Sequence, residues 1–159
     1  MKQKRLVSVI GALVLIISAV ALISGCQQAN GNQNNTSSDW RPVSNKSDLV
    51  GTWKAIVSGS GVVEKKIFYV ASDFSGYFKI DADYSMADAS FLASVGDVIS
   101  GLEGIGFIVV HDPENKTIIA TQNFTSTDLQ EMVSLIKLNS SKTKIKFTAG
   151  ENSVEYTKQ

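Results

Sequence analysis

Few side chains in this chain are of a type that does chemistry. Cys26 is the only cysteine and His111 the only histidine, so no disulfide can form within the chain. His111 stands before Asp112 and Pro113, residue types that favour a turn, and we interpret it as a solvated turn residue rather than a general base. No Gly-x-Ser-x-Gly motif supplies a nucleophilic serine. We therefore expect no catalytic residue, no cofactor and no enzymatic activity.

Asp81, Asp83 and Asp88 form a cluster of carboxylates that suggests a cation site. A calcium loop of the EF-hand type also needs a central glycine and a terminal glutamate, and neither stands at the required spacing. Carboxylates are stabilised near helix N-termini by the helix dipole, and we place Asp88 there. The two others are interpreted as part of a solvated turn, so the sequence predicts no metal site.

Cys26 closes the N-terminal segment of the chain. Lys2, Lys4 and Arg5 precede an uncharged run, Leu6–Ile23, as in a secretory signal. Its roughly 18 residues are also close to the lower limit for a membrane-spanning helix, which is the alternative. The stretch Leu22–Cys26, Leu-Ile-Ser-Gly-Cys, resembles the lipobox of bacterial lipoproteins. The resemblance implies cleavage before Cys26 and acylation of its thiol.

The lipoprotein resemblance also implies a partner and a location. The family carries two or three acyl chains on the cysteine, enough for stable attachment of Cys26 to a lipid bilayer. Gln27 stands where an Asp would imply retention in the inner membrane, so the outer membrane or cell surface is expected instead. Without residues 1–25 the chain has 12 basic and 15 acidic residues, a net charge of −3, and no basic patch for nucleic acid. We expect a protein anchored in the bacterial cell envelope.

The chain divides into three expected segments: residues 1–25, a signal peptide that is removed; residues 26–47, the acylated cysteine and a flexible tether; and residues 48–159, one folded domain. Gln27 to Ser38 are almost all Gln, Asn, Gly, Ser and Thr, a composition that cannot bury enough surface to fold. Trp40 interrupts this polar run, and it either docks onto the domain or lies at the lipid interface. The domain of about 110 residues is large enough for one hydrophobic core.

Alternating apolar and polar residues with turn residues between them predict a mostly β domain. Eight short strands are expected, at residues 48–57, 62–71, 77–82, 105–110, 117–122, 132–138, 143–149 and 153–157. Apolar residues at helical spacing predict one helix after the third strand, from Met86 to Ser100. Residues 128–139 suit either a helix or a strand, and we favour a strand with a short helical entry. The strands form an antiparallel meander, closed into a barrel or strongly bent.

The segment 105–110 is apolar on both strand faces, which indicates that its outer face is covered as well. We expect the helix to lie against that outer face rather than across the mouth of the barrel as a lid.

The stretch Asp48–Trp53 resembles the opening of lipocalins and of bacterial lipocalin-like lipoproteins, whose first strand carries a Gly-x-Trp motif. The resemblance implies that Gly51 allows close backbone approach and that Trp53 closes one end of a lipocalin-like β-barrel. It also implies a basic residue of the last strand over the Trp ring, for which Lys158 is the only candidate. The second lipocalin motif, Thr-Asp-Tyr, is absent, and the helix falls earlier in the chain than in lipocalins.

Two functions remain open for such a domain. An eight-stranded barrel is just wide enough to hold a small hydrophobic ligand, and Phe78, Phe107, Phe147 and Tyr156 would line its cavity. If these bulky side chains fill the interior instead, the barrel is a scaffold whose loops contact an envelope protein.

Overall fold

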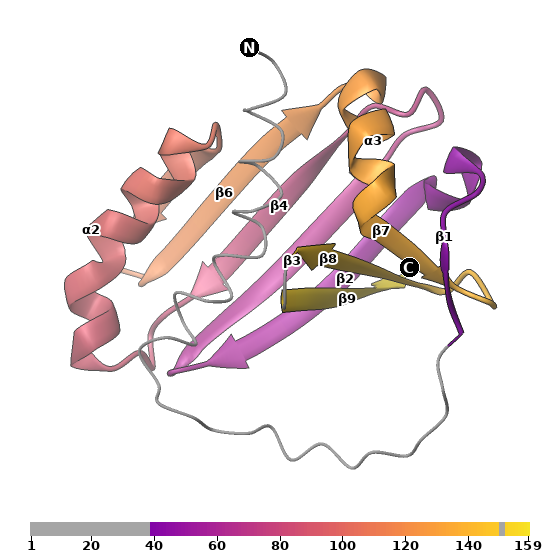
Figure 1. Ribbon diagram of the computed structural model, residues 1–159. Coiled ribbons are helices and arrows are strands. Elements are labelled where there is room, and N and C mark those ends of the chain that lie inside the picture. The colour runs from indigo at the N-terminus through magenta and orange to yellow at the C-terminus, as the bar shows by residue number, and fades with distance from the viewer. Residues whose placement is uncertain (1–38, 150–151) are drawn as a thin grey trace.

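The computed structural model describes residues 39–149 and 152–159, and within them it contains one antiparallel sheet of nine strands (Figure 1). The strands are β1 (Trp40–Pro42), β2 (Gly51–Gly59), β3 (Val62–Val70), β4 (Gly76–Asp83), β5 (Ile108–Asp112), β6 (Thr117–Phe124), β7 (Ile136–Asn139), β8 (Lys144–Ala149) and β9 (Asn152–Lys158). Their order across the sheet is β1-β7-β8-β9-β2-β3-β4-β6-β5. The mostly β class is thus confirmed, and each of the eight expected strands is present.

The helices are α2 (Ala89–Gly104) and α3 (Ser126–Met132), with short 3-10 turns η1 (Lys46–Leu49) and η2 (Val133–Leu135). The segment 126–139 therefore runs as helix, 3-10 turn and strand β7, which confirms a strand with a short helical entry. In the part of the chain that the structure describes, no helix has the length and apolar character needed to cross a membrane.

The sheet bends sharply between β2 and β9. β2 pairs with β3 along its whole length but with β9 at only two positions, Trp53 with Lys158 and Lys54 with Thr157. Beyond these pairs β9 leaves β2, and β7, β8 and β9 cross over one face of the remaining strands (Figure 1). Ala55–Gly59 of β2 and Asn152–Tyr156 of β9 do not pair with each other, and we call the boundary between these two segments the seam.

The predicted closed barrel is therefore wrong, whereas a strongly bent sheet, the other form considered, is compatible with the structure. The two end strands of the described sheet are β1 and β5, and they do not pair with each other. The strand order also differs from the predicted meander, because β6 rather than β5 lies beside β4. α2 packs on the β5 end of the sheet, where further strands would otherwise be needed to close a barrel.

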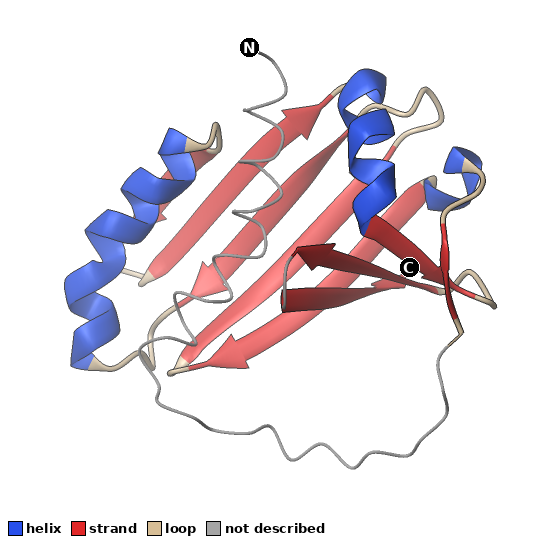
Figure 2. Ribbon diagram, in the orientation of Figure 1, coloured by secondary structure: helices blue, strands red, loops and turns tan. Residues whose placement is uncertain are grey.

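The core lies on the concave face of β2–β6, where side chains alternate with those of the convex face. The strand register aligns the concave residues in rows. One row is Trp53, Phe68 and Phe78; the next is Ala55, Lys66, Ile80 and Ala120; the third is Val57, Glu64, Ala82 and Ile118. Both helices and β7–β9 lie over this face (Figure 2), and most of these residues are buried. No described helix or strand covers the convex face in this way.

α2 lies on the concave face, so the expectation that it covers the outer face of residues 105–110 is wrong. Ile108 and Val110 of β5 face outward and remain 73% and 62% exposed. Phe91 and Leu102 of α2 are instead buried in the core, which offers them a larger apolar surface than one edge strand does. The helix also begins three residues later than expected and extends to Gly104.

The fold begins before residue 48. Trp40–Pro42 forms strand β1, which pairs with Lys137–Asn139 of β7. Trp40 is half-buried, and the Lys146 ammonium lies 4.7 Å from the centre of its ring. Of the two open interpretations, docking onto the domain is the one observed. The predicted signal peptide, Cys26 and most of the predicted tether lie outside the described residues.

Candidate functional site

Glu64 and Lys66 are two charged side chains in the apolar concave face of β3. The strand's alternation places them inward together with Val62 and Phe68. They are 5% and 1% exposed, and the Lys66 Nζ lies 2.9 Å from Glu64 Oε2. The distance is that of an ion pair, but among the described residues neither atom has a partner in hydrogen-bond geometry.

Tyr156 of β9 brings a hydroxyl to the same region from the opposite layer. The side chain is fully buried, and its hydroxyl has no hydrogen-bond partner in the described part of the chain. Burial, and secondarily the negative charge of Glu64, raises the pKa of this hydroxyl, so it stays protonated. We call Glu64, Lys66 and Tyr156 the concave polar cluster.

Gln122 adds a further polar atom to this face. Its Nε2 donates a hydrogen bond of 3.0 Å to the Ile105 carbonyl, but its buried Oε1 has no partner within the described residues. A buried polar group without a partner typically costs about 1 to 3 kcal/mol. A buried ion pair is often no more stabilising than apolar residues of the same volume. The burial of the concave polar cluster is therefore not accounted for by stability alone.

The cluster lies beside the seam. Across β2 and β3, Ala55 pairs with Lys66 and Val57 with Glu64. Tyr156 stands two residues before Lys158, at the point where β9 leaves β2. β2 thus carries the residues that pair with Lys66 and Glu64, and β9 carries Tyr156 itself.

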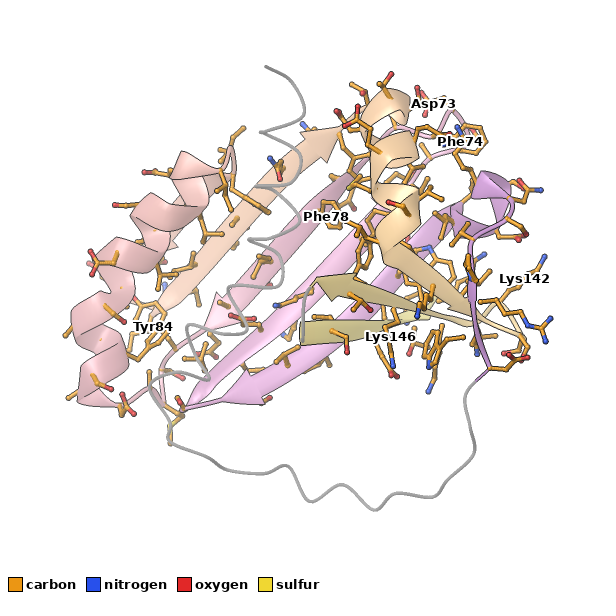
Figure 3. All side chains as sticks on the ribbon, in the orientation of Figure 1. Asp73, Phe74, Phe78, Tyr84, Lys142 and Lys146 are labelled. Atoms are coloured by element: carbon orange, nitrogen blue, oxygen red, sulfur yellow. The ribbon has the colours of Figure 1, made fainter. Side chains whose placement is uncertain are left out.

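The four aromatic residues expected to line a cavity are all buried. Three of them come together: the ring centroids of Phe78 and Phe147 are 5.8 Å apart and those of Phe147 and Tyr156 are 5.6 Å apart. Phe78 projects from β4 toward the crossing strands (Figure 3) and also stacks on Phe68 at 4.8 Å. Phe107 comes from the segment between α2 and β5. Aromatic rings in contact with one another thus fill one end of the concave face. Lys66 and Glu64 lie in the two adjoining rows of side chains.

Gly51, Trp53 and Lys158 meet at the bend of the sheet. Gly51 has a φ of +126°, a conformation that side chains other than glycine's rarely adopt, and an added Cβ would lie 3.2 Å from the Lys158 Cε. Trp53 is fully buried, and its indole N–H donates to the Leu49 carbonyl at 2.7 Å. The Lys158 ammonium lies 5.0 Å from the Trp53 ring centroid, the cation–π contact that the lipocalin resemblance implied. This arrangement exists here without a closed barrel.

His111 belongs to β5 rather than to the turn, so its interpretation as a turn residue is corrected. Its side chain is exposed, yet its Nε2 lies 2.6 Å from the Tyr84 hydroxyl, beside α2 (Figure 3). Asp88 accepts from the Phe91 N–H at 2.9 Å as the N-cap of α2, and Asp83 accepts from the Ser85 N–H at the end of β4. Among the described residues, no three His, Cys, Asp or Glu side chains are grouped to hold a metal ion.

Sequence reasoning missed Glu64 and Lys66, although a signal for them is present. Val62, Phe68 and Val70 share one face of β3, and the same alternation carries the two charged residues inward. Lys and Glu are almost never fully buried, so without the structure the surface is the default expectation for both.

No protein family, curated protein or solved structure matches this chain.

Proposed function

We propose that this chain is a bacterial lipoprotein, anchored in the cell envelope through acylated Cys26, whose folded domain binds a small hydrophobic ligand on its concave face. The anchor is inferred from the lipobox-like stretch Leu22–Cys26. Ligand binding is supported by one observation above all, the concave polar cluster, in which a buried ion pair and a buried hydroxyl have hydrogen-bonding capacity that no described residue uses. A ligand that supplied a polar group there would offset a cost that the domain alone carries.

Binding rather than catalysis is proposed for this site. Tyr156 is held protonated by its burial and is therefore a hydrogen-bond donor rather than a nucleophile or base. Lys66 lies in an ion pair with Glu64.

The anchor is tested by replacing Cys26 with Ala. The unaltered protein should carry the mass of its acyl chains and sediment with membranes, whereas Cys26→Ala should remain unprocessed or be released. A Cys26→Ala protein that is still cleaved before residue 26 and still partitions into detergent contradicts the anchor.

Ligand binding is tested by native mass spectrometry of the domain, made without residues 1–26 and purified from an extract of its own host. A bound apolar molecule that is lost on unfolding supports the proposal. A domain that is always recovered free of ligand, also after incubation with envelope lipid extract, contradicts it.

A scaffold function is the second candidate, and the convex face favours it. Ile56, Ile108 and Val110 of this face are 71%, 73% and 62% exposed, and no described element covers their strands on this side. Ile108 and Val110 stand two residues apart on one face of β5, and exposed apolar side chains grouped in this way mark contacts with other proteins. Crosslinking in intact cells from positions 56 and 110 would capture one recurrent envelope protein if this function holds, and only scattered neighbours if it does not.

A further inference from the structure

We propose that the concave polar cluster recognises an uncharged amphiphile, a hydrocarbon body that ends in one neutral group able both to donate and to accept hydrogen bonds. A hydroxyl or an amide has this chemistry. The inference rests on the proposed ligand-binding function and names the class of ligand.

The charge of the cluster excludes ionised head groups. Lys66 and Glu64 compensate each other at 2.9 Å, and both are almost completely buried. A carboxylate head would add an uncompensated negative charge beside Glu64, and an ammonium head would add a positive one beside Lys66. Uncompensated charge is strongly disfavoured in a buried site, so a neutral head is the one that fits.

The hydrogen-bonding capacity of the cluster requires a head group that can both donate and accept hydrogen bonds. The Lys66 ammonium has three donors, and the Glu64 carboxylate accepts at both oxygens, while their mutual contact uses little of this capacity. The Tyr156 hydroxyl adds one further donor. A hydroxyl or amide can accept from Lys66 or Tyr156 and donate to Glu64 at the same time. A plain hydrocarbon would leave all three groups as they are, and for that reason it should bind more weakly.

The neighbouring side chains suit the apolar body. Ala55, Ala82 and Ala120 occupy the same face as the charged pair, in the rows that contain Lys66 and Glu64. With Val57, Ile80 and Ile118 of the same rows they form an aliphatic surface, unlike the aromatic row that begins with Trp53. A hydrocarbon chain lying over them would keep its head at the cluster.

The seam is the boundary at which strand pairing does not join the two layers. Ala55–Gly59 of β2 pairs with β3, and Asn152–Tyr156 of β9 pairs with β8, but the two segments do not pair with each other. In the proposed binding step the layers separate here, which breaks no strand pairing but parts the Phe147 ring of β8 from the Phe68 ring of β3. A ligand that enters here meets Tyr156 on one side and Lys66 on the other.

The test uses the full-length protein as its bacterial host processes it, reconstituted in phospholipid nanodiscs. It is photolabelled with a diazirine derivative of 1-decanol, in competition with 1-decanol, decanamide, decanoic acid or decylamine at neutral pH. Labelled positions are mapped by peptide mass spectrometry. Partition into the disc is the same for every variant, so ratios between variants report binding to the domain.

We expect labelling in β3 and β9 that decanol and decanamide suppress at concentrations roughly tenfold below those of the acid and the amine. Tyr156→Phe removes only the hydroxyl and should raise the suppressing concentration of decanol roughly fivefold. The control Tyr77→Phe removes a hydroxyl from the convex face and should change nothing. The double variant Glu64→Leu/Lys66→Met should abolish the preference for neutral heads.

The outcomes separate the two proposals. Labelling that no competitor suppresses contradicts the ligand-binding function and the inference with it. Suppressible labelling with equal or better competition by the acid or the amine overturns the inference alone, and so does a Tyr156→Phe protein that behaves like Tyr77→Phe.

Discussion

The ion pair between Glu64 and Lys66 allows a quantitative test of the buried site. Lys66→Met leaves the Glu64 carboxylate buried without its counter-charge, and Glu64→Leu does the same to the Lys66 ammonium. Breaking a buried pair on one side typically costs about 3 to 5 kcal/mol of unfolding free energy. Replacing both partners with apolar residues is often neutral or stabilising, so Glu64→Leu/Lys66→Met should unfold within about 1 kcal/mol of the unaltered domain or above it. The losses of unfolding free energy in the two single variants should therefore not be additive in the double variant.

The assay is urea unfolding of residues 39–159, which contain every described strand, in the four proteins of a double-mutant cycle. A matched control exists on the surface: the Lys146 Nζ lies 2.9 Å from Glu155 Oε1, the same separation, but the two side chains are 24% and 49% exposed. A surface pair typically contributes about 0.2 to 1 kcal/mol. If the coupling energy of the buried pair falls in that range too, then the pair is in contact with water and the reasoning about the site is refuted.

Three further predictions use the same unfolding assay. Trp53→Ala should cost about 3 to 5 kcal/mol because the fully buried ring leaves a cavity, whereas Ile56→Ala, at a 71% exposed position, should change little; equal costs would contradict the burial of Trp53. Gly51→Ala should cost about 1 to 3 kcal/mol because its φ of +126° strains any other residue, and a neutral effect would show that the backbone adapts. The hydrogen bond from the Phe91 N–H is the main cause that lowers the pKa of Asp88 from 3.8, so the Asp88 carboxylate stabilises the fold above pH 3.8 and loses this contribution as the pH falls through the lowered pKa. The stability advantage of the unaltered domain over Asp88→Asn should therefore shrink between about pH 5 and pH 2. An advantage that persisted at pH 2 would contradict this account.

The strands were predictable because their signal is local. Thr143 to Ala149 alternate strictly, and β8 forms there. Closure of the sheet depends instead on which strands become neighbours, and no alternation specifies this. Trp53 and Lys54 pair with β9 at two positions only, and the sequence contains no sign that the pairing ends there. The same limit explains why β6, and not β5, lies beside β4.

The position of α2 shows how tertiary packing selects among local signals. Ser85 and Asp88 are both possible N-caps by type, and the helix begins after Asp88, whose side chain accepts from the Phe91 N–H. The doubly apolar strand around Ile108 indicated a covered outer face, but the helix packs on the concave side. Trp40 was ambiguous for a similar reason, since its short strand exists only through pairing with β7.

A purely structural role for the concave polar cluster has to be weighed against ligand recognition. Buried polar residues sometimes specify register, because a slip of one residue moves a strand's whole apolar set to the other face. In β3 that set is already large: Val62, Phe68 and Val70 are buried on the same face, and a slip would expose all three. The register is therefore fixed without Glu64 and Lys66, and the cost of burying them is not explained by it. Their place beside the seam, opposite a buried hydroxyl from the other layer, is what recognition of an incoming polar group requires.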